Sequence, residues 1–502
     1  MNKIRIGTHI FGKGSPINMW STIVSEEIES DLDEVKSLGF DNVVLLIPWS
    51  CFQTNIYKAE LDKEYLARLK KIFTVADEKE LKVILRIGYL WDSTPSNMFT
   101  YERFMKLPYD YEIKKQWCWF LKALYQQVKQ YKSFSLAFIS WEDFYWPIYR
   151  HYPNVKNDHD LLPFLQGSGF LEYINELKVL SLLGDINLDT SDYKNLLSSD
   201  SGLYSFFTHY YDNVIMRKIL DMSAMSFPNV EYEYRVDPEW IKDGKTISYH
   251  NWNTNFYKST LPVIYYHSNI GTKPSNVMNT TQANYHLKSL LERYAPMRRL
   301  GQKLPFIDQL NFFDDTYANW GSIDVEHDDE YAEKVFETLS KFSSGYAIWG
   351  LRDWRKNIAH NPVFERYDEG WVIDGSYSCD KNKLILKSQC KISQAIPHLA
   401  LDEGERFVFI EGFSNSSAKV TVSINEDFTK SFEIPNGNFS EEIKIPESGR
   451  ISNVELNLQN GMTINEISVF GRSFSQGFAD SSGNLYPIAK RLVELQNEYL
   501  KS

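Results

Sequence analysis

The sequence lacks long apolar runs, and this absence bears on where the protein works. Nowhere do eighteen or more apolar residues follow one another, so no segment is expected to cross a membrane as a helix. The N-terminus enters a strand pattern at residues 4–7 without the apolar core of a signal peptide. The sequence therefore predicts a cytoplasmic protein with no membrane span.

Cysteine and the common ligand motifs are also scarce. The sequence contains four scattered cysteines: Cys51, Cys118, Cys379 and Cys390. They form neither a CxxC motif nor a Cys/His spacing suited to zinc, so we expect buried thiols; a disulfide between Cys379 and Cys390 across a hairpin is the less favoured alternative in a reducing cytoplasm. No glycine-rich phosphate-binding loop is present, and His9 and His267 lack a third ligand at metal spacing. Neither a cofactor nor a metal is expected.

Positive charge is not in excess. The chain carries 54 Lys and Arg against 66 Asp and Glu, which gives a formal net charge of −12 at pH 7. A protein that neutralises many phosphates needs clustered Lys and Arg. Nucleic acid is therefore not expected as a partner, and the oligomeric state is left open.

Aromatic residues are abundant instead, at 15% of the chain with 13 Trp and 31 Tyr. Most large rings fill cores, but rings exposed on a concave surface stack against the faces of sugars. This composition makes a carbohydrate the first candidate for a bound partner.

The first three quarters of the 502-residue chain alternate between strand and helix patterns. Amphipathic stretches at residues 25–38 and 63–79 separate apolar runs suited to strands buried on both faces. Successive β-then-α units imply right-handed crossovers and a parallel sheet. Eight strands are predicted, at residues 4–7, 42–47, 82–87, 136–139, 230–236, 261–266, 304–307 and 345–350. A (β/α)8 TIM barrel over residues 1–375 accounts for them, so the fold class is α/β.

Two segments do not fit a plain barrel. Residues 147–228 are longer than one crossover needs and contain several helical stretches, which predicts an insertion that caps the barrel mouth. Residues 376–473 change to short alternating runs separated by Asn, Gly and Ser turns, a pattern typical of an antiparallel β-sandwich. Helical periodicity then returns, so we predict that residues 474–502 form a closing barrel helix and that the sandwich is inserted before it.

Polar residues follow the predicted strands where barrel enzymes place their catalytic groups, just past the strand C-termini. Glu142 and Asp143 follow the fourth strand and Asp308 follows the seventh; the two strand ends lie across a barrel from each other. Glycoside cleavage needs two carboxyl groups on opposite sides of the anomeric carbon, so we interpret these three residues as catalytic candidates. The same rim offers candidate substrate-binding residues: Trp49, Arg86, Trp91, Arg235, Tyr266, His267, Gln309 and Trp349.

The order of several short motifs resembles clan A glycoside hydrolases. The motifs are Gly39-Phe40-Asp41-Asn42-Val43-Val44 with Pro48-Trp49, then Glu142-Asp143, then Tyr346-Ala347-Ile348-Trp349-Gly350, and finally Gly477-Phe478 with Gly483-Asn484-Leu485-Tyr486-Pro487. The likeness covers most of residues 1–374 and 474–502. It implies a barrel hydrolase with a Glu acid/base after the fourth strand and a nucleophilic Glu at the end of the seventh.

The sequence departs from that clan at both catalytic positions. The clan's Asn-Glu pair aligns with Trp141-Glu142-Asp143 in two ways, and we prefer Glu142 as acid/base because its longer side chain is the type the clan uses, with Asp143 assisting. The seventh strand contains no Glu. Asp308 could serve as the counterpart if geometry compensates for its shorter arm, whereas Gln309 could not act as a nucleophile.

Simpler roles compete with these interpretations. Arg86 and Arg235 could merely neutralise interior carboxylates, and the tryptophans could pack in the core, with Trp349 the best candidate for a sugar platform. The leading hypothesis is a glycoside hydrolase or transglycosidase acting on an oligosaccharide or polysaccharide. The alternative is a non-hydrolytic carbohydrate-binding or polysaccharide-assembly protein, motivated by the missing Glu. Non-glycan chemistry on the same barrel is a third hypothesis, because a fold does not fix a function.

Overall fold

The structure of the protein is a computed structural model. It describes residues 4–12, 15–92, 94–154, 161–179, 203–235, 238–240, 246–248, 263–267, 280–294, 302–311, 329–380, 382–396, 401, 404–474 and 477–501. No helix in these ranges is both long enough and apolar enough to traverse a bilayer. All four cysteines are free, and the predicted thiols are buried at Cys51 and Cys390 but partly exposed at Cys118 and Cys379.

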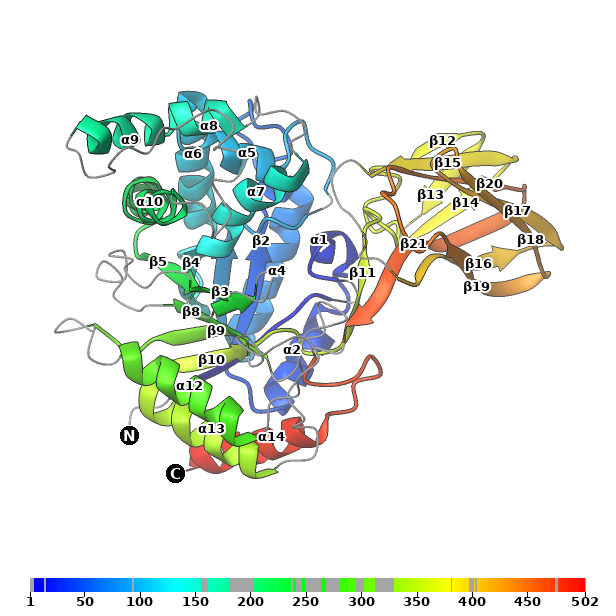
Figure 1. The fold of residues 1–502 in the computed structure, drawn as a ribbon. Helices are drawn as coiled ribbons and strands as arrows, with labels where there is room; N and C mark the ends of the chain where they lie inside the picture. The colour runs from blue at the N-terminus through cyan, green and yellow to red at the C-terminus, as the bar shows by residue number, and fades with distance from the viewer. Residues whose placement is uncertain are drawn as a thin grey trace.

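Eight parallel strands close into a barrel in the order β1-β10-β9-β8-β5-β4-β3-β2 (Figure 1). The strands are β1 (Arg5–His9), β2 (Asn42–Ile47), β3 (Lys82–Ile87), β4 (Phe134–Ser140), β5 (Val230–Arg235), β8 (Val263–His267), β9 (Phe306–Asn311) and β10 (Gly345–Ile348). The first strand closes the ring, since Thr8 pairs with Val43 on one side and with Ile348 on the other. All eight predicted strands are present.

Helices follow the first three strands for reasons that the sequence makes visible. After β1 come α1 (Met19–Thr22) and α2 (Ile28–Ser37), after β2 come α3 (Trp49–Phe52) and α4 (Lys63–Glu78), and after β3 come α5 (Thr100–Lys106) and α6 (Tyr111–Val128). Asp62 caps α4 by accepting from the amides of Glu64 and Tyr65, and Asp110 caps α6. Just past α2, Gly39 adopts φ +81°, a conformation that only glycine reaches without strain.

A set of helices lies between β4 and β5, where an insertion is predicted. They are α7 (Trp141–Asn154), α8 (Leu161–Gly167), α9 (Phe170–Val179), α10 (Tyr204–Tyr210), a π-helical turn η2 (Tyr211–Met216) and α11 (Arg217–Ser226). The last of them packs on α6, where the Trp117 indole donates to Ser223 Oγ at 2.8 Å. This contact places α11 beside a barrel helix, while α8, α9 and α10 make up the additional layer (Figure 1).

The connection from β5 to β8 differs from the ideal alternation. Within its described residues it contains β6 (Pro238–Trp240) paired with β7 (Thr246–Ser248), and no helix. Two further helices then follow β8 and β9: α12 (Thr280–Tyr294) and α13 (Asp329–Phe342).

Two antiparallel sheets follow the barrel, which we call the two-sheet region. One sheet contains β11 (Trp354–Asn357), β13 (Tyr377–Asp380), β14 (Lys383–Leu386), β16 (Arg406–Ser414), β19 (Gly437–Ile445) and β21 (Met462–Phe474). The other contains β12 (Val372–Asp374), β15 (Cys390–Ala395), β17 (Ala418–Ile424), β18 (Phe428–Ile434) and β20 (Asn453–Leu458). Side chains from both sheets, such as Val408 and Leu456, share one hydrophobic cluster.

The two-sheet region begins earlier along the chain than residue 376. Trp354 in β11 already pairs with Phe474 in β21, and β12 also precedes that residue. The reason is the length of β21, whose thirteen residues extend beyond the sheet toward the barrel (Figure 1). The chain then returns to the barrel as α14 (Pro487–Lys501), which packs against α13 and receives a hydrogen bond from Tyr346 of β10 at Gln496.

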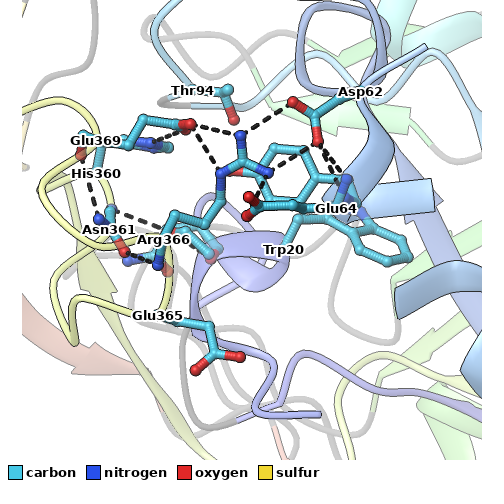
Figure 2. A network of polar contacts seen from close by, with 12 residues as sticks. Trp20, Asp62, Glu64, Thr94, His360, Asn361, Glu365, Arg366 and Glu369 are labelled. Atoms are coloured by element: carbon cyan, nitrogen blue, oxygen red, sulfur yellow. Dashed lines mark hydrogen bonds and ion pairs between the residues drawn. The ribbon is translucent and has the colours of Figure 1, made fainter. Parts of the chain in front are cut away.

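One arginine fastens the segment between β11 and β12 to the barrel (Figure 2). The Arg366 guanidinium binds Asp62 through two parallel hydrogen bonds, of 2.8 Å and 2.9 Å, and also donates to Glu369 at 2.9 Å. Glu369 in turn contacts His360 Nε2 at 3.0 Å. Because Asp62 also caps α4, this network joins the start of a barrel helix to the connection between the two sheets.

Candidate active site

The barrel interior is layered, and the layers follow from the alternation of side chains along each strand. An apolar cluster fills one level: Val44, Ile84, Leu136, Phe138, Val263, Phe306 and Ala347. Two residues after Ile84, Phe138 and Phe306 on the same three strands come Arg86, Ser140 and Asp308. Their side chains point to the same side as those of the apolar cluster. Glu233 shares their level because it pairs with Ser140 in the β4–β5 register. A polar layer therefore lies directly above an apolar plug.

Arg86 is the centre of this polar layer. Its Nε donates to Asp143 Oδ2 at 2.8 Å, and its Nη2 donates to Glu142 Oε2 at 3.0 Å and to Ser140 Oγ at 3.1 Å. Its Nη1 lies 3.8 Å from Asp308 Oδ2 and 4.0 Å from Glu233 Oε1. We call these six residues the Arg86 cluster. One cation thus faces four carboxyl groups.

Asp143 is fully buried and held at both oxygens. Besides the bond from Arg86, its Oδ1 accepts from the amide of Leu90 at 3.0 Å. Burial raises the pKa of Asp143 to about 6, although the charge and hydrogen bond of Arg86 oppose the shift. With both oxygens occupied by protein donors, Asp143 acts as a support for Arg86.

Glu142 is the carboxylate of the cluster that reaches solvent. Its side chain is 16% exposed, whereas those of Asp143, Glu233 and Asp308 are at most 1% exposed. The difference has a local cause: β4 ends at Ser140 and α7 begins at the next residue, so Glu142 lies in the first turn of a helix. The amides of a first turn stabilise negative charge.

Asp308 lies at an irregularity of β9. Ile264 pairs with Ile307 and Tyr265 pairs with Gln309, so Asp308 is an extra residue opposite β8. The register with β10 shifts at the same place. Such bulges change the direction of a side chain. Asp308 is the third residue of β9 and its side chain is fully buried, so it lies inside the barrel and not at its rim.

Glu233 and Asp308 contact the same guanidinium nitrogen. Burial raises the pKa of Glu233 to about 7. The positive charge of Arg86 opposes this shift, and the negative charge of Glu142 adds to it. Burial and then the neighbouring Glu233 charge raise the pKa of Asp308 well above its ordinary range. Two buried carboxyl groups at such close quarters resist being ionised together.

His9 and Trp349 occupy the ends of neighbouring strands near this layer. The His9 Nδ1 lies 3.0 Å from the carbonyl of Ile348, which can only accept, so Nδ1 carries the proton. Burial lowers the pKa of His9 to about 3, and the ring is neutral. Trp349 meets it edge-on at 4.8 Å between ring centroids and is 8% exposed.

The other sequence candidates are placed as follows. Trp49 is fully buried and packs against Trp117 and Phe120. Trp91 is partly buried at the junction of the barrel core and the core of the two-sheet region. Gln309 is buried beside Asp308 in the bulge, with its Nε2 unpaired among the described residues.

Three candidates have side chains outside the described part of the chain. Arg235, Tyr266 and His267 belong to β5 and β8, and only their backbone positions are given. Their proposed contacts with a substrate stay predictions.

Two residues of the site were missed in the sequence. Glu233 is one, and the signal for it was present: a charge in the middle of a strand that is buried on both faces must point into the barrel and find a partner there. Tyr89 is the other; its ring lies 5.5 Å from the Arg86 guanidinium carbon and covers it. Nothing in the sequence alone indicates that contact.

Among the described residues, no group of three or more His, Cys, Asp or Glu side chains is arranged to hold a metal ion. The carboxylates of the cluster surround a guanidinium instead. The chemistry available to the described cluster is therefore that of carboxyl groups around one fixed cation.

Comparisons with known proteins add the following. No protein-family model matches the sequence, and no curated protein matches it. Among solved structures, a GH5_18 variant from Streptomyces cattleya in complex with Manβ1-4GlcNAc is 14% identical, covering 70% of this chain and 72% of its own, with a TM-score of 0.45. The exo-β-1,4-mannosidase Op5Man5 from Opitutaceae bacterium strain TAV5 is 13% identical. The match covers 70% of this chain and 52% of the mannosidase, with a TM-score of 0.41. A family 1 β-glucosidase from Thermotoga maritima is 11% identical. The match covers 70% of this chain and 88% of the glucosidase, with a TM-score of 0.37.

Proposed function

We propose that the protein is a glycoside hydrolase or transglycosidase that acts on an oligosaccharide or polysaccharide, with Glu142 as general acid/base and Asp308 as its counterpart. The observation that carries the proposal is their common partner: Glu142 contacts Nη2 of Arg86 and Asp308 lies near Nη1. One guanidinium thus brings together two carboxyl groups that come from opposite parts of the barrel, and glycoside cleavage needs two such groups in one site.

The exposure of the carboxylates supports the assignment of Glu142. A general acid must reach the glycosidic oxygen, and Glu142 is the member of the Arg86 cluster with side-chain exposure beyond 1%. Asp143 cannot take that role without releasing Arg86 and the Leu90 amide. We therefore assign Asp143 an assisting role, through the orientation of Arg86.

The neighbourhood of Asp308 supports the rest of the site. Gln309 lies beside it in the bulge, and Trp349, which is 8% exposed, directly follows the adjacent strand β10 and donates its backbone amide to Leu310 of β9. We propose Trp349 as a platform for a sugar ring and Gln309 as a hydrogen-bond donor to the substrate, because its Nε2 finds no partner among the described residues.

We also propose that the two-sheet region is a β-sandwich inserted before the last barrel helix. The shared hydrophobic cluster of its sheets supports the first part. The contacts of α14 with α13 and with Tyr346 support the second.

A second candidate function is a binding or polysaccharide-assembly protein without hydrolysis. It is favoured by Asp308, because burial and then the neighbouring Glu233 charge raise its pKa well above the ordinary range, and a raised pKa works against an ionised nucleophile. The absence of a Glu from β9 points the same way.

One experiment separates the two functions. The wild-type protein is screened on a glycan array, and each bound glycan is then incubated with the protein and assayed for new reducing ends. Hydrolysis of a bound glycan, lost in Asp308→Asn while binding persists, is expected. Binding of glycans without any product would support the assembly function and contradict the proposal.

A further inference from the structure

We propose that Glu233 and Asp308 form a carboxyl pair that holds one proton between its two members, with Glu233 as the positioning residue for Asp308. The catalytic meaning of this pair rests on the proposed function; the shared proton itself does not. Glu233 lies on β5, a strand to which no catalytic carboxylate was assigned from the sequence.

The first support is the placement of the two side chains. β8 lies between β5 and β9 in the barrel, and both carboxyl groups point inward across it to the same nitrogen, Nη1 of Arg86. Asp308 reaches this level because of the bulge opposite Ile264 and Tyr265. The two carboxyl groups lie 3.8 Å and 4.0 Å from this nitrogen, and a side-chain hydrogen bond between Glu233 and Asp308 is among the causes that raise the pKa of Asp308, so the two groups are close neighbours.

The second support is hydrogen bonding. All four oxygens of Glu233 and Asp308 are buried, and none has a partner of good hydrogen-bond geometry among the described residues; the Ser140 hydroxyl lowers the pKa of Glu233 as a neighbouring donor but leaves the two Asp308 oxygens unserved. An unsatisfied buried carboxylate is costly, and two side by side are more so. A proton on one member supplies a donor to the other, and this single change satisfies an oxygen on each side.

The third support is the charge that surrounds the pair. From β3 the pair faces Arg86, whose other nitrogens are already committed to Asp143 and Glu142, both on α7. His9 on β1 is neutral, so it adds no charge to the pair. The side chains of β8 after Val263 lie outside the described residues. The guanidinium of Arg86 carries one positive charge in all and already shares it with Asp143 and Glu142, so it cannot balance two further negative charges at the pair.

The raised pKa values of both groups agree with this geometry. Because the two groups interact strongly, the proton belongs to the pair and is not assigned to either residue. At neutral pH the pair then carries a single negative charge opposite Glu142. One carboxyl group is ionised there and the other donates a hydrogen bond to it, which holds the ionised group in place.

The proton can be counted without any substrate. Thermal unfolding of the full-length protein at pH 7 is followed by calorimetry in two buffers with different ionisation enthalpies, and the difference gives the protons released on unfolding. The unfolded chain ionises both carboxyl groups, so the wild type is expected to release about one proton from the pair. Glu233→Gln and Asp308→Asn should each release about one proton fewer, because a single carboxyl group beside Arg86 ionises.

Glu337→Gln is the control, since Glu337 is exposed and its hydrogen bond with Lys341 lowers its pKa, so this carboxyl is ionised in the folded and in the unfolded chain at pH 7. It should release as many protons as the wild type. Infrared spectra of the folded wild type at pH 7 give a second measurement that does not depend on a variant folding: the carbonyl band of a buried carboxylic acid is expected. A wild type without this band, or variants that release as many protons as the wild type, would overturn the pair.

These outcomes are distinct from those that test the proposed function. If Glu142→Gln keeps its hydrolytic activity while the proton is counted, the acid/base assignment fails and the pair stands. If hydrolysis depends on Glu142 but no proton is found, only the pair fails.

Discussion

Arg86 Nε donates to Asp143 Oδ2 across 2.8 Å, and both side chains are buried. This bond fixes the rotation of the guanidinium plane. Asp143 is itself fixed by the Leu90 amide, so the remaining nitrogens of Arg86 have defined directions, one toward Glu142 and one toward Glu233 and Asp308. The orientation of the whole cluster depends on this pair.

Arg86→Lys should therefore be destabilising although the charge is kept. A lysine ammonium is a point charge and cannot donate in the fixed directions of a guanidinium, so at least one buried carboxylate loses its partner. Breaking a buried ionic network typically costs 3–5 kcal/mol. Urea unfolding should show a loss of about that size, and any glycosidase activity should fall with it. A loss below about 1 kcal/mol would mean that the network does not depend on the shape of Arg86.

The stability contributed by Asp143 should depend on pH in a defined direction. Its pKa is raised from 3.8 to about 6 in the folded protein, so the contribution is complete below about pH 3.8 and is lost as the pH rises through 6. Each pKa unit corresponds to about 1.4 kcal/mol, which gives a change of roughly 3 kcal/mol. Asp143→Asn should therefore destabilise the protein most at pH 4.5 and progressively less toward pH 7.5.

Taking the difference between wild type and Asp143→Asn at each pH isolates this effect. His9, whose pKa burial lowers to about 3, contributes a dependence of the opposite sign, but it is present in both proteins and cancels. A difference in unfolding free energy that does not change with pH would contradict the raised pKa of Asp143.

The barrel could be predicted from the sequence because its strands are buried on both faces. Runs such as Asn42–Ile47 and Lys82–Ile87 are apolar without alternation, which is typical of a parallel sheet. The change to alternation at β17 likewise reflects sheets with one buried and one exposed face. These patterns are local, so a single sequence contains them.

The site was predicted only in part, because its geometry depends on register. Asp308 was placed at a strand end, but the bulge that sets its direction arises from the pairing of three strands. Glu233 was overlooked because Tyr232 and Tyr234 beside it give the run the look of a half-exposed strand. Trp49 was interpreted as a rim residue because it follows β2, yet the short helix α3 turns it into the core.

The contrast between two tryptophans can be tested. Trp49→Ala should lower the unfolding free energy by about 3–5 kcal/mol, since it removes a fully buried ring and its hydrogen bond to Gln53. Trp349→Phe should leave stability closer to the wild type and weaken sugar binding. Chemical unfolding and titration with a bound glycan measure the two effects, and an unchanged affinity in Trp349→Phe would remove Trp349 as a platform.

Arg366 should matter for stability and not for chemistry. Its two bonds to Asp62 are nearly buried, and their loss in Arg366→Met leaves Asp62 and Glu369 without their cation (Figure 2). We expect a loss of about 3–5 kcal/mol. Asp62→Ala should lower the unfolding free energy by about 1 kcal/mol more than Arg366→Met does, because it removes the cap of α4 as well as the ion pair. Glycan affinity measured in the folded Arg366→Met protein should be unchanged; a changed affinity would place this network in the binding site.

The central claim is that Glu142 protonates the leaving group of a glycoside. The most direct measurement compares wild type and Glu142→Gln on two substrates with the same sugar, one with a leaving group that needs protonation and one with a strongly acidic dinitrophenolate that does not. We expect Glu142→Gln to lose about 10²–10⁴-fold in the bond-cleavage rate on the first substrate and far less on the second. Equal losses on both substrates, or a Glu142→Gln protein as active as the wild type on the first, would contradict it.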